Sequence, residues 1–232
     1  MKNDARYAVY LVPPRNSPLW NLGCRWLGRD PETQETFAPQ DVQGFPVEKL
    51  LRVTASPRRY GFHATLKAPF RLADGVDEAR LSAEIARLAD SVGSFQMHAL
   101  KVDRLNGFIA LLLACPSEAL ADLERRCVVA LDPLRAPMEE AERARRVSAS
   151  LTPRQRDFLE RWGYPYVFDE FRFHMTLTER VDDADAGLLM PWIVQNFHAA
   201  LADQSQGLDI AMFVQPEPDK EFLLLRRFPL AR

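Results

Sequence analysis

The spacing of hydrophobic and polar residues along this chain predicts alternating strands and helices. Alternating or continuous apolar residues predict strands at 6–12, 62–72, 95–102, 108–114, 171–181, 209–214 and 221–228. Apolar residues at helical spacing predict helices at 18–27, 47–54, 77–92, 117–131, 138–148, 153–162 and 185–202. Helices that alternate with antiparallel hairpins favour an α+β fold over a doubly wound parallel sheet.

Residues typical of turns and helix ends support several of these boundaries. Ser17-Pro18 and Thr152-Pro153 each combine an N-cap hydroxyl with a proline at the first helical position. Asn106-Gly107 separates two strand-like segments, and this dipeptide accepts the positive φ of a tight hairpin turn. Residues 30–46 contain three prolines and a glycine without apolar periodicity, which predicts a loop.

The two halves of the chain share an element order and a motif. Each half contains a strand, a helix and then two strands, and residues 62–66 and 173–177 both read F-H-x-T-L. We therefore predict a single domain over residues 1–232 with two lobes related by a pseudo-twofold axis. Each lobe is expected to hold an antiparallel sheet flanked by helices, with a central cleft between the lobes and strand exchange between them as an option.

The repeated motif places a histidine and a threonine on the same face of each predicted strand. Alternate residues of a strand point to the same side, so His63 projects together with Thr65, and His174 together with Thr176. The phenylalanine, the central residue and the leucine of each motif face the opposite, packing side. If the lobes are related by symmetry, the two histidine faces meet across the cleft.

Such a histidine pair suits acid–base chemistry on a phosphodiester. One neutral and one protonated imidazole can coexist near neutral pH, and each proton transfer contributes typically 10²–10⁴-fold to a rate. Hydroxyls of Thr65 and Thr176 can donate to the non-bridging phosphate oxygens. Two histidines without a carboxylate or cysteine cluster fall short of the usual ligand count of a catalytic zinc or two-metal site, so we expect neither a metal nor a cofactor.

The paired H-x-T-L motifs, about a hundred residues apart, resemble those of the two-histidine (2H) phosphoesterase superfamily. The stretches RYAVY at 6–10, RYGFHATLKAPF at 59–70 and FRFHMTLT at 171–178 resemble a bacterial branch associated with phosphonate metabolism. This resemblance implies a bilobal fold with a central cleft and metal-independent hydrolysis of nucleoside 2′,3′-cyclic phosphates or a cyclic ribose phosphate. It places His63, His174, Thr65 and Thr176 at the family's catalytic positions.

From the motifs and the resemblance we expect a cyclic phosphodiesterase, a hydrolase that opens a small cyclic phosphodiester to a monoester. An RNA 2′,5′ ligase or an RNA 3′-end phosphodiesterase of the same superfamily is the alternative enzyme, and it would need a basic channel for several nucleotides. A non-catalytic module that binds a phosphorylated metabolite is the alternative outside enzymology.

Other residues are weaker candidates for the site. Lys67 continues the face of His63 and could add positive charge at the phosphate, although a lysine at a strand end is as often solvated. Tyr60, Arg172 and Phe108 could contact a base or sugar, but aromatic residues in strands usually pack in the core. The remaining histidines, His98 and His198, lack a following threonine and keep a structural interpretation.

Charge and composition limit the partners. The net charge of −2 and a pI near 6.1 argue against a grip on long nucleic acid, so the expected partner is a small phosphorylated nucleotide or ribose phosphate. No apolar run approaches the length of a membrane span. The first residues do not form a secretory signal and the three cysteines are odd in number and widely spaced, which favours the cytoplasm.

Overall fold

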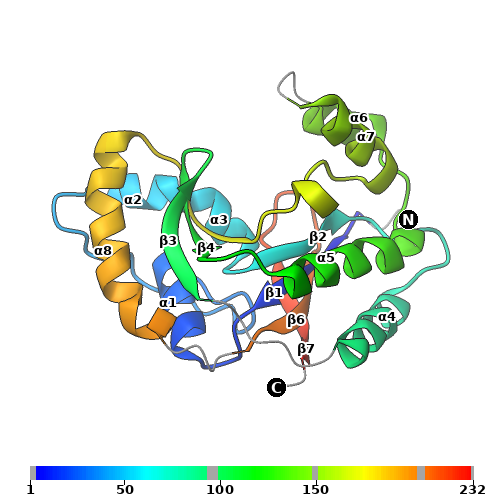
Figure 1. Ribbon diagram of the computed structural model, residues 1–232, viewed down its shortest axis with the longest axis horizontal. Coiled ribbons are helices and arrows are strands. Elements are labelled where there is room, and N and C mark those ends of the chain that lie inside the picture. The colour runs from blue at the N-terminus through cyan, green and yellow to red at the C-terminus, as the bar shows by residue number, and fades with distance from the viewer. Residues whose placement is uncertain (1–3, 93–98, 148–150, 203–206, 231–232) are drawn as a thin grey trace.

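The computed structural model describes residues 4–92, 99–147, 151–202 and 207–230. Their seven strands form one open antiparallel sheet in the order β3-β4-β5-β2-β1-β6-β7 (Figure 1). The strands are β1 Arg6–Val12, β2 Ala64–Phe70, β3 Leu100–Leu105, β4 Phe108–Leu113, β5 His174–Arg180, β6 Asp209–Gln215 and β7 Leu223–Pro229. The helices are α1 Pro18–Leu27, α2 Val47–Val53, α3 Ala55–Tyr60, α4 Glu78–Ser91, α5 Glu118–Leu131, α6 Glu140–Arg146, α7 Pro153–Trp162 and α8 Asp183–Ala202.

The α+β class predicted from the sequence is confirmed, and most predicted elements fall within a few residues of the observed ones. Ser17 and Thr152 cap α1 and α7 through their hydroxyls, and Asn106 and Gly107 both have positive φ in the β3–β4 turn. Helix α3 was not predicted because six residues are too few to display a helical period. The start of the predicted strand 95–102, with His98, lies outside the described residues.

The sheet mixes strands from both halves of the chain. The hairpin β3–β4 of the first half pairs with β5, whereas β6 and β7 of the second half continue the sheet from β1. The two groups of strands meet only at β2 and β5, through the single bridge between Ala64 and Met175. The H-x-T-L motifs lie at this junction because each one begins one of its two strands.

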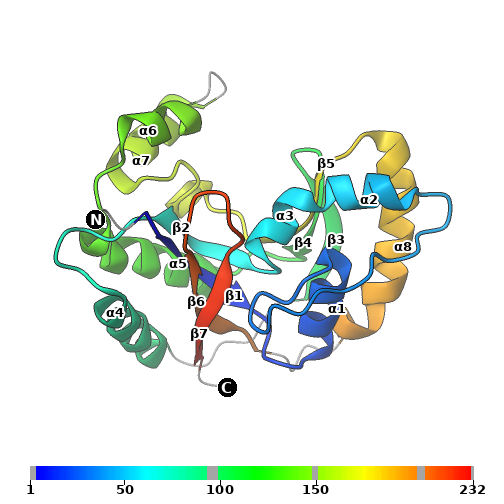
Figure 2. The same cartoon turned by 180° about the vertical axis from the view of Figure 1, so that it is seen from behind.

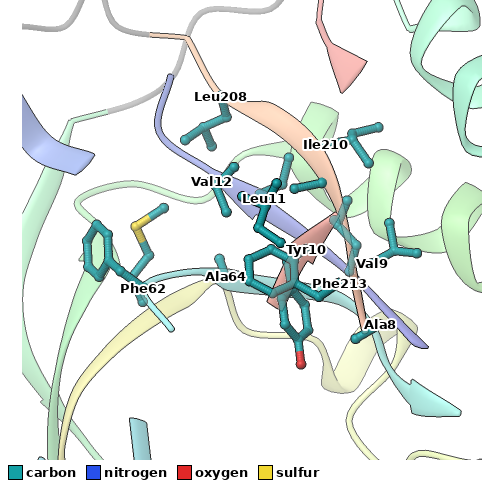
Figure 3. Close-up of a cluster of buried hydrophobic side chains, with 14 of the residues drawn as sticks. Ala8, Val9, Tyr10, Leu11, Val12, Phe62, Ala64, Leu208, Ile210 and Phe213 are labelled. Atoms are coloured by element: carbon teal, nitrogen blue, oxygen red, sulfur yellow. The ribbon is translucent and has the colours of Figure 1, made fainter. Parts of the chain in front are cut away.

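Helices lie against both groups of strands. Helices α4 and α5 contact β2, β6 and β7, whereas α1 and α8 contact β5 and β3 (Figures 1 and 2). Strands β1 and β6 are covered on both faces, and their apolar side chains pack together in the centre of the molecule (Figure 3). Phe62 is fully buried against Gly23 of α1, where a Cβ would come within 2.2 Å of the phenyl ring. Phe62 therefore anchors the start of the motif in the core, directly before His63.

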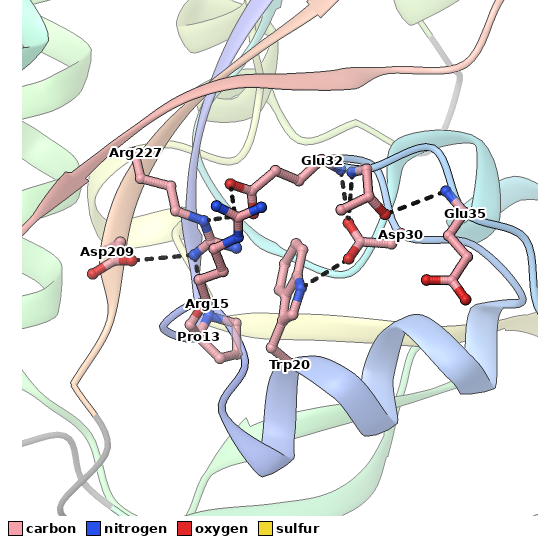
Figure 4. A network of polar contacts seen from close by, with 9 residues as sticks. Pro13, Arg15, Trp20, Asp30, Glu32, Glu35, Asp209 and Arg227 are labelled. Carbon is pink, nitrogen blue, oxygen red and sulfur yellow. Dashed lines mark hydrogen bonds and ion pairs between the residues drawn. The ribbon is translucent and has the colours of Figure 1, made fainter.

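A polar network holds the loop after α1 against the sheet (Figure 4). Arg227 of β7 donates to the Pro13 carbonyl at 2.8 Å and pairs with Glu32 at 3.0 Å and Asp209 at 3.1 Å. The indole of Trp20 donates to Asp30 at 3.3 Å. Asp30 and Glu32 flank Pro31, so the network fixes the position of this proline. Pro31 in turn packs against Gly61, two residues before His63.

Candidate functional site

The junction between β2 and β5 brings the two H-x-T-L motifs together. Ala64 is paired with Met175 in antiparallel register. Extending this register by one residue in each direction places His63 opposite Thr176, and Thr65 opposite His174. Side chains directly opposed in such a pair have Cβ atoms about 5 Å apart. The four side chains thus form a square on one face, with the two histidines on one diagonal and the two threonines on the other.

Both imidazoles are held by the same local hydrogen bond. The Nδ1–H of His63 donates to the Gly61 carbonyl at 2.8 Å, and the Nδ1–H of His174 donates to the Arg172 carbonyl at 2.7 Å. Because a carbonyl can only accept, these bonds select the tautomer in which Nε2 carries the free lone pair. The Thr65 hydroxyl lies 3.3 Å from His63 Nε2 and donates to it. Each motif therefore presents an Nε2 atom that can accept a proton.

Gly61 is required by the backbone that precedes His63. Its φ of 82° and ψ of 173° lie in a region that is essentially restricted to glycine. A Cβ at this position would also stand 2.8 Å from Cγ of Pro31. The equivalent position in the second motif is Arg172, whose backbone carries no positive φ. The two histidines thus form the same kind of hydrogen bond although the backbone conformation two residues earlier differs.

The surroundings of the two rings differ. His63 stacks on Tyr10 with ring centroids 3.7 Å apart, and the Tyr60 ring lies 6.4 Å away. His174 has a tilted contact with Phe108 at 5.6 Å. Loss of solvent around the ring lowers the pKa of His63 to about 4, with a smaller contribution from the nearby His174, and loss of solvent also lowers the pKa of His174.

These pKa shifts correct one expectation from the sequence. We expected one neutral and one protonated imidazole near neutral pH, but burial lowers the pKa of both rings from the usual value of histidine. Both rings are therefore neutral at pH 7 in the protein without ligand. A bound anion would reverse this effect, because a negative charge close to an imidazole stabilises its protonated form.

A cavity of about 240 Å³ opens beside His174, and we call it the His174 cavity. Its wall includes Thr65 and His174 together with two residues predicted to contact substrate, Phe108 and Arg172. The Arg172 guanidinium is held over the cavity by the Asp169 and Phe171 carbonyls. These predicted residues thus lie beside one histidine.

Glu124 of α5 also lines the His174 cavity, and the sequence analysis missed it. Its side chain is buried and accepts a hydrogen bond from the Phe168 amide at 3.1 Å. Burial raises the pKa of this carboxyl to about 7. The signal in the sequence was its position between Leu123 and Cys127 on the apolar stripe of α5, where a charged residue is unusual.

Lys67 was predicted to bind phosphate, and in the structure its ammonium contacts other groups of the chain. Its ammonium is buried and donates to Asp132 and to the Val128 carbonyl, both at 3.1 Å. Lys67 does project from the same side of β2 as His63, but its long side chain reaches the end of α5.

A second cavity of about 780 Å³ lies next to the first, and we call it the arginine cavity. It shares Tyr164 and Tyr166 with the His174 cavity, and it is also lined by the predicted residue Tyr60. Its arginines come from four segments: Arg6, Arg59, Arg71 and Arg146. These four arginines could not be grouped from the sequence, because only the tertiary structure brings their segments together.

The described residues include neither a cluster of metal ligands nor a membrane-spanning helix. Within them, no three histidine, cysteine, aspartate or glutamate side chains gather as a metal site would require. No helix among them is both long enough and apolar enough to cross a membrane.

Comparison with known proteins shows the family. The chain belongs to the family described as "Protein of unknown function (DUF1045)", whose model matches residues 65–223. It is 38% identical over 230 residues to the "Ribose 1,5-bisphosphate phosphokinase PhnN" of Janthinobacterium sp. (strain Marseille), covering 97% of this chain and 51% of that protein. The protein of the same name from Laribacter hongkongensis (strain HLHK9) is 39% identical over 221 residues, with 95% and 51% covered. The chain spans about half the length of these relatives.

The names of these relatives overturn the predicted activity. We expected a hydrolase that opens a cyclic phosphodiester, with an RNA ligase or RNA 3′-end phosphodiesterase as the alternative. Both relatives are named as a phosphokinase for ribose 1,5-bisphosphate, which is a transferase acting on a small sugar phosphate. The predictions of a cyclic phosphodiesterase and of an RNA enzyme are therefore wrong.

Proposed function

We propose that this chain binds a small phosphorylated ribose, with the phosphate held at the junction of β2 and β5. The observation that carries this proposal is the antiparallel register of Ala64 with Met175, which sets both histidine–threonine pairs on one face beside a cavity. In this proposal Thr65 and Thr176 donate their hydroxyls to phosphate oxygens. His63 and His174 exchange protons with the same phosphate through their Nε2 atoms.

Charge supports a phosphate as the ligand. A phosphate monoester carries a charge of about −1.5 to −2 at pH 7, whereas both imidazoles are neutral there without ligand. The anion raises the pKa of each ring, so one or both rings take up a proton when the ligand binds. The protonated Nε2–H then donates a charge-assisted hydrogen bond, which is roughly twice as strong as a neutral one.

The relatives support ribose phosphate as the class of ligand. Their name specifies a ribose bisphosphate, and this chain matches about half of each of them. The sequence of this chain contains no G-x-x-x-x-G-K-[S/T] motif for the phosphates of a nucleoside triphosphate. The ribose bisphosphate in the names of the relatives therefore supports a sugar phosphate as the ligand proposed for this chain. The opposed H-x-T-L motifs also support descent from the two-histidine phosphoesterase superfamily, which does not specify the reaction.

Calorimetry with ribose 5-phosphate and with unphosphorylated ribose tests this function. We expect only the phosphorylated sugar to bind, and we expect its apparent enthalpy at pH 7 to change with the ionisation enthalpy of the buffer because protons are taken up. His63→Gln and His174→Gln should each weaken binding about tenfold or more. His198→Gln is the matched control because His198 is exposed on α8. Equal binding of ribose and ribose 5-phosphate would exclude the proposal.

A further inference from the structure

The arginine cavity contains two guanidinium groups that no described carboxylate neutralises. The Arg6 Nε donates to the side-chain carbonyl of Gln215 at 2.8 Å, and Arg59 donates to the Pro218 carbonyl. Both acceptors are neutral. Among the described residues neither arginine has a carboxylate oxygen within 4.0 Å, and the buried Nε of Arg59 has no hydrogen-bond partner there. Arg6 and Arg59 therefore line this cavity without an ion pair to the described part of the chain.

The position of these two groups is fixed by a buried amide. Gln215 is 0% exposed, and its amide nitrogen donates to the carbonyls of Pro218 at 2.9 Å and Lys220 at 2.7 Å. Its oxygen binds Arg6, and the Pro218 carbonyl also accepts from Arg59. One side chain thus orders both guanidinium groups and the loop between β6 and β7. Such ordering lowers the entropic cost of binding an anion.

The other two arginines of the cavity are paired. Arg71 lies 3.4 Å from Glu142, and Arg146 lies 2.7 Å from the same carboxylate. Arg71 is also 3.5 Å from Glu139. Arg146 and Arg71 therefore contribute little free positive charge, and the exposed acids Asp4 and Asp219 at the rim oppose an anion. The unpaired charge is concentrated on Arg6 and Arg59.

The arginine cavity adjoins the phosphate position of the proposed function. Tyr60 follows Arg59 in α3, lines the arginine cavity and lies 6.4 Å from the His63 ring. Tyr164 and Tyr166 form a wall shared by the two cavities. Tyr60 therefore borders both the His63 ring and the cavity that Arg6 and Arg59 line.

We propose that the arginine cavity binds a second phosphate, so that the ligand of this chain is a sugar phosphate with two phosphate groups. One phosphate lies at the histidine–threonine pairs and the other between the guanidinium groups of Arg6 and Arg59, which suit the geometry of phosphate oxygens. This inference rests on the proposed function and narrows it from ribose phosphates in general to bisphosphates. The volume of about 780 Å³ falls within the range of small-molecule sites.

The test compares ribose 1,5-bisphosphate with ribose 5-phosphate by calorimetry at constant ionic strength. In the wild-type protein we expect the bisphosphate to bind about tenfold to a hundredfold more tightly, as two charge-assisted contacts allow. Arg59→Gln and Arg6→Gln should each reduce this ratio, and the double variant should bring it close to one. The affinity for ribose 5-phosphate should fall far less in these variants than the affinity for the bisphosphate.

Three controls separate the outcomes. Arg52→Gln removes an exposed arginine of α2 that lines neither cavity, and it should keep the wild-type ratio. Arg6→Lys should retain part of the preference, and thermal melting checks that each variant is folded. If ribose 5-phosphate binds but the wild-type ratio is one, or if the double variant keeps the preference, the second phosphate site is wrong and the proposed function stands. If neither sugar phosphate binds, both proposals fail.

Discussion

The two H-x-T-L motifs occupy different environments although their sequences are nearly identical. His63 is stacked on Tyr10 and lies two residues after a glycine with positive φ, whereas His174 lines a cavity and lies two residues after Arg172, which has no positive φ. Both rings nevertheless make the same Nδ1–H bond to the carbonyl two residues earlier. The motif therefore determines the tautomer and orientation of each imidazole, whereas the surrounding core determines how readily each imidazole is protonated.

The largest expected difference between the two motifs concerns the residue that accepts the Nδ1–H bond. Gly61→Ala should lower the free energy of unfolding by about 3 kcal/mol, because a Cβ is strained at φ 82° and collides with Pro31. Arg172→Ala should cost less than about 0.5 kcal/mol, since Arg172 is exposed and has ordinary backbone. Urea unfolding of both variants measures the contrast. Equal losses would show that Gly61 has no special role.

The buried carboxyl of Glu124, which lines the His174 cavity, should make the folding stability depend on pH. The pKa of Glu124 is raised to about 7 from an unfolded value near 4.5, so the folded state binds more protons between these values. The stability of the wild type relative to Glu124→Gln should fall by about 2 to 3 kcal/mol as the pH rises from 4.5 to 7. Urea unfolding across this range tests the sign. A difference that does not change with pH would contradict the raised pKa.

His63 should make the folding stability change with pH in the opposite direction to Glu124. Its folded pKa of about 4 lies below the unfolded value near 6.5, so the unfolded state binds more protons between these values. The stability of the wild type relative to His63→Gln should rise by about 1 to 3 kcal/mol between pH 4 and pH 6.5. Titration by NMR should also find the His63 ring protonating near pH 4. A His63 titration near 6.5 would remove the contrast with ordinary histidines.

The smallest expected effects come from the threonines. Thr65→Val and Thr176→Val should each weaken binding of ribose 5-phosphate by about 1 kcal/mol, or about fivefold, because each loses one hydroxyl donor. The two losses should be similar, since the register of β2 and β5 sets the threonines on equivalent positions of the square. Thr178→Val is the control for an effect on stability alone, because Thr178 is fully buried and accepts a hydrogen bond from the Ile109 amide. Strongly unequal losses of affinity would contradict this symmetry and would place the phosphate nearer to one of the two motifs.

The sequence supported some of these features better than others. The alternation of residues in each motif was enough to predict that His63 and Thr65 share a face, because this follows from the local geometry of a strand. The same alternation could not show that the long side chain of Lys67 pairs with Asp132 at the end of α5, which is far away in the sequence. The activity predicted from the resemblance was also wrong, since the curated relatives carry the name of a kinase.

By itself, the sequence determined most of the strands and helices, and that a histidine and a threonine share one face in each of two strands. These features depend on neighbouring residues, whose periodicity is visible in one chain. Only the tertiary structure decided that β2 pairs with β5, that Glu124 reaches the His174 cavity, and that Arg6 and Arg59 face one space. Strand pairing, desolvation and charge depend on residues far apart in the chain, and no local pattern specifies them.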